Sequence, residues 1–161
     1  MTLILGACVS VAGFGQVNGP DYKAGVGLRL SGSYYDAFAA SLKLFVTEQG
    51  AVEFNAGGRN MNYGRTNVSV SAAYQHHFPI GNIEGFKWFV GGGLSLVNSF
   101  ADDDNAEDGF GLVVFPTGGV EYKFNFPLAV SADFRPSIYL VRPYNEDFSP
   151  NFGVSARYTF K

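Results

Sequence analysis

Charged side chains are scarce in this sequence, and the basic ones do not cluster. Asp, Glu, Lys and Arg together make up 16% of the 161 residues, whereas soluble domains contain about 25%. The formal net charge is −3, and a protein that binds nucleic acid normally presents a basic surface. The sequence therefore gives no electrostatic basis for a nucleic-acid partner.

Long apolar runs are also missing. A membrane-spanning helix needs about 20 predominantly apolar residues, and no stretch beyond residue 16 has that character. The apolar run within Met1 to Gln16 is shorter and ends in small residues, which is typical of a secretory signal segment. We therefore expect residues 1–16 to be a signal segment, cleaved near Gln16, although no Lys or Arg precedes the run. Residues 17–161 would then form a single domain.

Cysteine occurs once, at Cys8. The sequence Leu5-Gly6-Ala7-Cys8 matches a lipobox, the signal for lipidation of an exported protein at its cysteine. The alternative is a cysteine that is discarded with the signal segment. In that case the mature chain has no disulfide chemistry.

Alternation of apolar and polar residues is the dominant pattern. In Asn151 to Phe160 the even positions are Phe, Val, Ala, Tyr and Phe, and the odd positions are polar, charged or Gly. A period of two indicates a strand with different surroundings on its two faces. About eight segments of this kind, close to the ~9–11 residues of a membrane strand, predict an all-β fold: an eight-stranded antiparallel up-and-down transmembrane β-barrel. The segments are 24–31, 38–46, 52–59, 68–78, 88–97, 110–124, 128–140 and 151–160.

The connections between these segments alternate in length. Short ones lie near Glu48, Gly81 and Asn125, and longer ones lie near Tyr34, Tyr63, Asp103 and Asn145. Outer-membrane barrels have short periplasmic turns and longer external loops. Within the sixth segment, Pro116 and Gly118 predict a bulge or bend.

The composition of the two faces indicates which one lies inside. The polar face is mostly Gly, Ser and Ala, whereas a water-facing exterior would hold more Lys and Glu. About one charge per strand lies on that face: Arg29, Lys43, Glu53, Arg59, Glu121, Asp133, Arg135 and Arg157. We place this face in the lumen, which side chains fill in a barrel of eight strands. Since an unpaired buried ion costs several kcal/mol, we expect arginines to bridge Glu53, Glu121 and Asp133.

Aromatic residues on the apolar face gather near the predicted strand ends, where rings lie at the depth of lipid headgroups. The short-turn group is Phe78, Trp88, Tyr122, Phe124, Tyr158 and Phe160, and the long-loop group is Tyr35, Phe38, Phe110 and Phe152. The alternative explanation is an aromatic core in a soluble sandwich.

Several stretches resemble the small OmpA/OmpX-type outer-membrane β-barrel family, particularly its short members. They are Gly25 to Arg29, Tyr74 to Gly85, Trp88 to Gly93, Gly119 to Phe124, and Ala156 to Phe160. The resemblance implies a location in the outer membrane of a Gram-negative-type envelope, in contact with the lipid bilayer and lipopolysaccharide. It also implies a partly or fully plugged lumen and no common enzymatic activity. The last strand is similar to the signal read by the barrel-assembly machinery, although Lys161 follows the terminal aromatic Phe160 here. We expect a monomer.

Candidate chemistry is sparse. His76 and His77 point to opposite faces of one strand, so they are poorly placed to bind one metal ion. One should lie at the membrane interface and the other inside. A lipid-modifying barrel enzyme would need a His and a Ser near the outer leaflet, but these histidines fall at the predicted periplasmic end, and Ser69 and Ser71 carry no mark of activation. We therefore predict no catalytic, cofactor or metal residues.

The acidic loop from Asp102 to Asp108 is the most unusual external feature. Its spacing does not match an EF-hand, and it is interpreted either as a solvated loop or as a weak site for a divalent cation or a partner.

The sequence thus predicts a non-enzymatic outer-membrane barrel with a structural or surface-interaction role through its external loops, where function commonly resides. The alternatives are a soluble or lipid-anchored lipocalin-like barrel with an apolar ligand inside, a lipid-modifying barrel enzyme, or a narrow pore.

Overall fold

The computed structural model describes residues 21–33, 35–61, 65–101, 109–141 and 148–161, and the regular elements in these ranges are β-strands. They are β1 (Ala24–Ser31), β2 (Phe38–Phe45), β3 (Gly50–Met61), β4 (Arg65–Pro79), β5 (Phe86–Ala101), β6 (Gly109–Lys123), β7 (Leu128–Phe134), β8 (Ser137–Val141), β9 (Phe148–Ser149) and β10 (Phe152–Phe160). In these ranges no helix is long and apolar enough to cross a membrane. The predicted signal segment, residues 1–16, lies outside the described residues.

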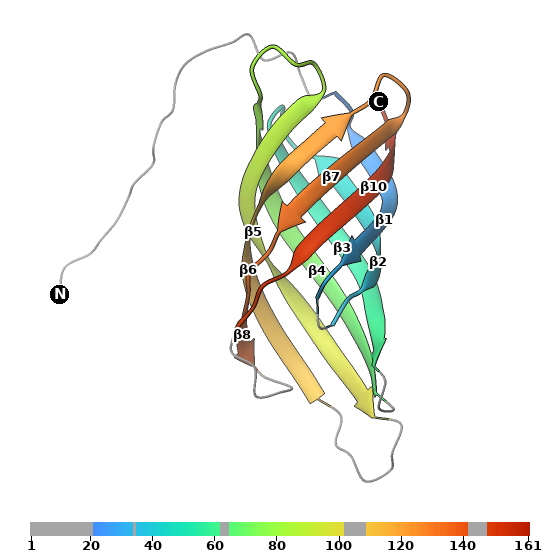
Figure 1. The fold of residues 1–161 in the computed structure, drawn as a ribbon, viewed down its shortest axis with the longest axis vertical. Helices are drawn as coiled ribbons and strands as arrows, with labels where there is room; N and C mark the ends of the chain where they lie inside the picture. The colour runs from blue at the N-terminus through green and yellow to red at the C-terminus, as the bar shows by residue number, and fades with distance from the viewer. Residues whose placement is uncertain (1–20, 34, 62–64, 102–108, 142–147) are drawn as a thin grey trace, which may run out of the picture.

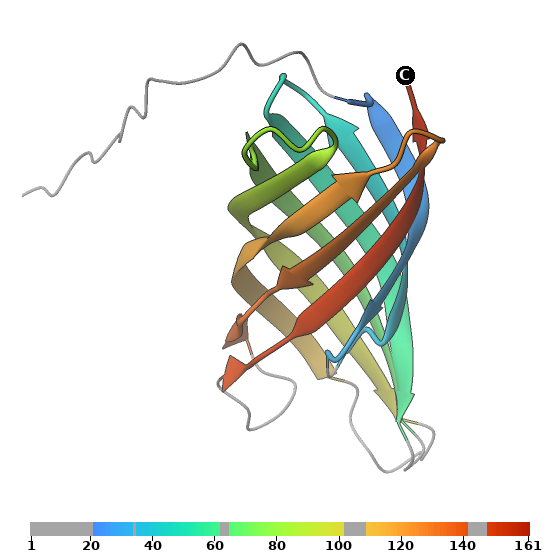
Figure 2. The same cartoon turned by 45° about the horizontal axis from the view of Figure 1, so that its top comes forward.

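The strands form a closed antiparallel barrel. β1 pairs with β2 on one side and with β10 on the other, and β5 pairs with β6. The sheet therefore closes on itself, and its central part has no unpaired edge strand. β7 and β8 lie end to end and together take the place of one strand in the wall, and β9 and β10 do the same. The ten elements therefore make an eight-stranded barrel with tilted strands (Figures 1 and 2), which confirms the predicted fold class.

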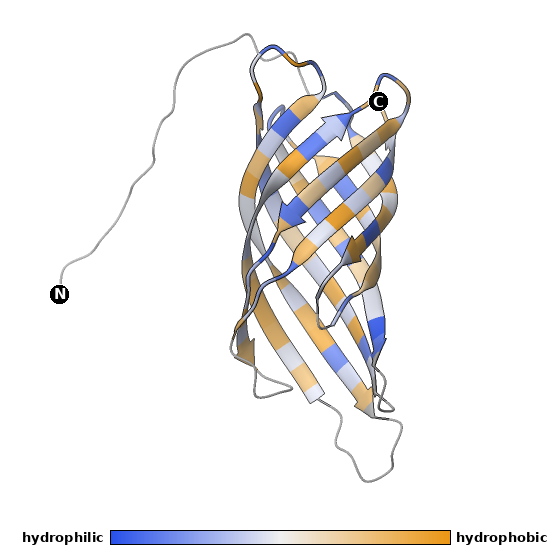
Figure 3. Ribbon diagram, in the orientation of Figure 1, coloured by the Kyte–Doolittle hydropathy of each residue, from blue (hydrophilic) through white to orange (hydrophobic). Residues whose placement is uncertain are grey.

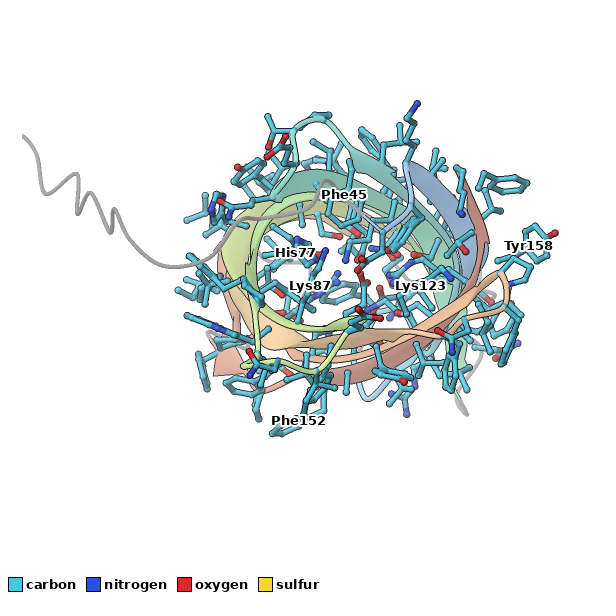
Figure 4. All side chains as sticks on the ribbon, turned by 90° about the horizontal axis from the view of Figure 1, so that it is seen from above. Phe45, His77, Lys87, Lys123, Phe152 and Tyr158 are labelled. Carbon is cyan, nitrogen blue, oxygen red and sulfur yellow. The ribbon has the colours of Figure 1, made fainter. Side chains whose placement is uncertain are left out.

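The two faces of each strand differ as the alternation predicts. In β10 the odd-numbered residues are buried and the even-numbered ones are exposed, and apolar and polar residues alternate along the wall (Figure 3). Seen from above, His77 and Lys123 lie within the ring of strands, whereas Phe152 and Tyr158 point outward (Figure 4). The polar face is the lumen, as predicted. A lipocalin-like barrel would need the apolar face inside, so the structure contradicts that alternative.

The two ends of the barrel are built differently. We call the end with residues 46–49, 80–85 and 124–127 the turn end, and the opposite end the loop end. Both the start of β1 and the end of β10 lie at the turn end (Figure 1). In the turn at 80–85, Gly81 and Gly85 adopt positive φ angles of 56° and 79°, which glycine tolerates best.

Strand length, more than loop length, distinguishes the loop end. β1 and β2 have 8 residues each, whereas β4, β5 and β6 have 15, 16 and 15. The predicted loop from Asn60 to Arg65 is wrong at its borders, because strand pairing continues to Met61 and Arg65. The predicted loop residues Tyr34, Tyr63, Asp102 to Asp108 and Asn145 lie outside the described residues.

The wall is interrupted beside β6. Pairing of β6 with β5 runs without a break through Pro116 and Gly118, so no bulge is present on that side. On its other side, pairing with β7 ends at Gly118 and pairing with β8 starts again at Val114. A register shift between β6 and β8 lies further on, between Leu112 and Val113.

Most of the predicted aromatic residues face outward. At the turn end Phe78 stacks on Trp88 with ring centroids 4.5 Å apart, and Tyr158 packs edge-on against Phe160. Towards the loop end Phe152 is 68% exposed and packs against Phe134. Tyr35 is the exception: it is buried in the lumen, so its assignment to the outer aromatic band is wrong.

Gly27 allows β1 and β10 to approach closely where the barrel closes. A β-carbon there would collide with the carbonyl oxygen of Ala156 and lie 2.6 Å from the Cα of Arg157. We expect Gly27→Ala to lower the free energy of unfolding by about 1–3 kcal/mol, the usual cost of overpacking, measured by urea unfolding in detergent. Gly32→Ala is the control, since the nearest atom to its β-carbon lies at 3.9 Å. An equal effect of the two substitutions would contradict this explanation.

Candidate functional site: the charged lumen

The centre of the lumen is organised around the carboxylate of Glu53. Its Oε1 accepts from Arg135 Nη2 at 2.6 Å and from the amide of Asn55 at 2.9 Å. Its Oε2 accepts from Arg157 Nη2 at 2.7 Å and from the amide of Gln75 at 2.9 Å. Four donors from β3, β4, β10 and the segment between β7 and β8 therefore meet on one fully buried carboxylate.

A second carboxylate extends this network towards the loop end. Asp133 Oδ1 accepts from Arg29 Nη2 at 2.6 Å and lies 2.8 Å from Arg135 Nε. Arg135 thus bridges Asp133 and Glu53 with one guanidinium group. Since the side chains of all three are at most 4% exposed, these charge-assisted contacts lie in a low-dielectric region, where each is stronger than on a surface.

A third carboxylate, Glu121, is held mainly by a lysine. Its Oε2 accepts from Lys43 Nζ at 2.7 Å, whereas Arg157 Nη1 is 3.8 Å away. Lys43 Nζ also lies 2.9 Å from His77 Nε2. A lysine can only donate, so Nε2 accepts and the ring proton is on Nδ1, which faces the carbonyl of Gln49 at 3.3 Å. The predicted arginine bridges are confirmed for Glu53 and Asp133, while the closest cation to Glu121 is Lys43.

Aromatic rings close the turn end of the lumen. Tyr22 packs edge-on against Phe45 at 5.0 Å, Phe45 lies 5.0 Å from His77, and His77 lies 5.2 Å from Phe89. The hydroxyl of Tyr22 donates to Glu121 Oε1 at 2.9 Å. These rings shield the ions below them from the solvent at this end.

An apolar cluster lies in the lumen towards the loop end. Val97, Val113 and Tyr35 form a buried cluster, against which Tyr139 packs. The Tyr35 hydroxyl lies 3.1 Å from the Ser137 hydroxyl. Nearby, burial raises the pKa of the Asp36 carboxyl in the loop, an effect that Arg29 opposes.

Charges of opposite sign are equal in number among the buried residues. Among the described residues, four cations and four carboxyl groups are at most 5% exposed: Arg29, Lys43, Arg135 and Arg157, and Asp36, Glu53, Glu121 and Asp133. Inward-facing serines complete the coordination of the cations, as where Arg157 donates to Ser41 and Ser131. The lumen that the structure describes is thus filled by mutually neutralising side chains.

The two histidines point to opposite faces of the strand, as predicted. His77 is inside, and His76 is outside, where it packs against Tyr74 and Phe78. Among the described residues, no group of three or more His, Cys, Asp and Glu side chains could hold a metal ion. The contacts of the His77 ring nitrogens are Lys43, Gln49 and Glu121, so the structure does not bring Ser69 or Ser71 to it.

Two aromatic residues of the lumen escaped the sequence reasoning. Tyr22 and Tyr35 lie before and after β1, in segments without alternation. Their burial, at 2% and 5% exposure, follows from the closed shape of the barrel, since each folds in from one end. The feature of the sequence that could have indicated their burial is that both are large aromatic residues next to a strand end.

An inward-facing polar network and an outward-facing apolar surface on eight antiparallel strands define the fold of the small OmpA/OmpX-type outer-membrane barrels, and this chain has that fold.

Two solved structures are similar to it. The N-terminal β-barrel domain of Pseudomonas aeruginosa OprF has a TM-score of 0.61 and 17% identity, over 86% of this chain and 99% of that domain. Neisserial surface protein A has a TM-score of 0.56 and 17% identity, over 85% of this chain and 94% of that protein. No protein-family model matches the sequence, and no curated protein matches it. At this level of identity the similarity concerns the fold.

Proposed function

We propose that this protein is a non-enzymatic barrel of a Gram-negative-type outer membrane, which acts in envelope integrity or surface interaction through its loop end. The observation that carries the proposal is the distribution of polarity: ions inside, and large apolar side chains outside. Outward residues such as Leu28, Val70 and Leu94 are each about half exposed (50%, 55% and 48%). Such a surface is unfavourable in water and matches a bilayer interior.

The orientation follows from the two ends. The turn end, where β1 begins and β10 ends, would face the periplasm. The longer strands β3 to β6 would carry the loop end beyond the outer surface. The proposed partners are the lipid bilayer and lipopolysaccharide around the wall, and the barrel-assembly machinery at β10. The filled lumen favours a non-conducting barrel over a narrow pore, and we propose that the barrel is a monomer.

Membrane placement is tested by cell fractionation and a heat-modifiability gel. We expect the protein in the outer-membrane fraction, and we expect unboiled and boiled samples to migrate differently, because a closed barrel resists unfolding in detergent. A deletion strain scored for adhesion, serum survival and detergent sensitivity then tests the surface role. Recovery in the soluble fraction, with no change of migration on boiling, would contradict the membrane placement.

A further inference from the structure

The outer face of the wall carries few polar side chains, and three of them are neighbours. Apart from tyrosine and tryptophan, the outward-facing polar residues of the described strands are Asn60, Thr66, His76 and Asn98. His76 lies near the turn end, packed against Tyr74 and Phe78. The other three lie together at the loop end of β3, β4 and β5.

Two exposed aromatic rings lie beside these three residues. Thr66 lies opposite Asn60 on one side and opposite Phe100 on the other, and Asn98 lies opposite Phe110. Residues that face each other in this way have Cβ atoms about 4.5–5.5 Å apart. Phe100 and Phe110 are 43% and 56% exposed. We call the group of Asn60, Thr66, Asn98, Phe100 and Phe110 the amide–ring patch.

The polar groups of the amide–ring patch are available to a ligand. Asn60 and Asn98 are exposed, and Thr66 is half-buried. None of the three side chains makes a hydrogen bond within the part of the chain that the structure describes. Each amide can both donate and accept hydrogen bonds, as can the hydroxyl. The patch itself contains no charged side chain.

The patch lies where the wall extends furthest towards the loop end. Phe38, the first residue of β2, pairs with Gly58, so β3 continues past the end of β2 from Arg59 to Met61. β4, β5 and β6 also reach further in this direction than β1 does (Figure 1). The proposed function places this end outside the bilayer, at the level of the sugars of outer-leaflet lipopolysaccharide.

Exposed amides beside aromatic rings suit a neutral sugar. The C–H groups on one face of a sugar ring can pack on the electron-rich face of an aromatic ring, and its hydroxyls exchange hydrogen bonds with amides and hydroxyls. Phosphate groups and acidic sugars are normally held by Arg or Lys, which the patch lacks. Phe152 is the contrast: it is 68% exposed but packs against Phe134 on an apolar part of the wall.

We propose that the amide–ring patch binds a neutral sugar ring in the oligosaccharide of a neighbouring lipopolysaccharide molecule. Phe100 and Phe110 would pack against the face of the sugar, and the amide of Asn98 would bind its hydroxyls. This inference rests on the membrane placement proposed above. It gives the proposed contact with lipopolysaccharide a definite site and a preference for uncharged sugars.

Photo-crosslinking in the cell envelope tests the site. Benzoylphenylalanine replaces Val68, which is 44% exposed and lies directly opposite Asn98. We expect an adduct with lipopolysaccharide in cells that make a complete core oligosaccharide. The yield should fall several-fold in cells whose lipopolysaccharide is truncated to lipid A and its acidic inner sugars.

The same crosslinker at Leu94 separates this inference from the membrane placement. Leu94 lies on the outer face of β5, further from the loop end than Asn98, and should give lipid adducts with either lipopolysaccharide. Lipid adducts at Leu94 without a lipopolysaccharide adduct at Val68 would overturn the sugar site alone. The absence of lipid adducts at Leu94 would overturn the membrane placement and the sugar site together.

Substitutions within the patch test its chemistry. Asn98→Leu removes an amide, Phe100→Leu removes a ring, and Thr66→Val removes a hydroxyl with little change of shape. In samples that still migrate differently before and after boiling, each should lower the yield of adduct at Val68 several-fold.

Two matched controls lie outside the patch. Asn82→Leu removes an exposed amide from the turn at 80–85, and Phe152→Leu removes an exposed ring. Both should leave the yield unchanged. Equal yields in the patch variants and the controls would show that the patch is only a solvated rim, and would overturn the proposal.

The preference for uncharged sugars is tested with the isolated oligosaccharide. The folded full chain in phosphatidylcholine nanodiscs is mixed with oligosaccharide released from lipopolysaccharide by mild acid, and saturation-transfer NMR is recorded. We expect the largest transfer to ring protons of the neutral sugars, reduced several-fold by Asn98→Leu and unchanged by Asn82→Leu. Larger transfer to the phosphorylated or acidic sugars, or no transfer, would overturn the assignment.

Discussion

Replacing Glu53 with glutamine is expected to lower the free energy of unfolding by about 3–5 kcal/mol, the usual cost of breaking a buried ion pair. Arg135 and Arg157 donate to this carboxylate at 2.6 and 2.7 Å, and the substitution would leave both cations without their main counter-charge in a buried site. Glutamine has nearly the same size and shape, so the effect reports charge and hydrogen bonding more than packing. Urea unfolding in detergent micelles measures it.

Glu84→Gln is the matched control. Glu84 lies exposed in the turn at 80–85, and a surface substitution of this kind normally changes stability by less than about 0.5 kcal/mol. If Glu53→Gln unfolded at the same urea concentration as the Glu84 variant, the network would not contribute to stability. The lumen would then have to be stabilised by its serines and aromatic rings.

An arginine in place of Leu94 is expected to destabilise the barrel by about 2–4 kcal/mol when it is folded in a bilayer, the range for a charge at the midplane on the lipid side of such a wall. Leu94 lies on the outer face of β5, between Trp88 near the turn end and Phe100 near the loop end. The measurement is unfolding of the protein from lipid vesicles by denaturant.

Ile83→Arg separates the effect of lipid from that of arginine itself. Ile83 is somewhat more exposed than Leu94, at 58% against 48%, but lies in a turn, where the cost should be about 0–1 kcal/mol. Similar costs at both positions would show that water surrounds the wall. A water-soluble thiol reagent gives a second readout on the Cys8→Ser background, since it should label Ile83→Cys and spare Leu94→Cys or Val130→Cys in isolated envelopes.

The fold could be predicted from the sequence because its main signal is local. Side chains alternate along each strand whatever the neighbouring strand is, so the scarcity of charge beside Arg29, Lys43 and Glu53 was enough to identify the lumen side. The break in the strand after Phe134 was not predicted. It lies at Pro136, which has no N–H to donate and which the register of β6 with β7 and β8 places opposite Pro116. That register depends on how the strands pair and cannot be read from one strand alone.

The site could be predicted only in part, because its contacts span the barrel. Arg157 and Glu53 are 104 positions apart in the chain, and which cation meets which carboxylate depends on strand tilt and stagger. Alternation places such residues inside but gives no height along the axis. Glu121 was therefore correctly placed in the lumen, whereas its closest cation, Lys43, was not foreseen.

The pairing of β1 with β10 has a consequence for the order of events in biogenesis. Ala24 lies opposite Phe160, so the ring cannot be completed until β10 has been synthesised. Until then β1 keeps an open edge, Arg29 lacks Asp133, and Glu53 lacks Arg157. Unfinished chains would therefore carry both a strand ready to aggregate and unneutralised ions, and long-range joining of this kind is slow. The topology therefore makes the interval before β10 is in place the one in which the chain is most exposed to wrong pairing.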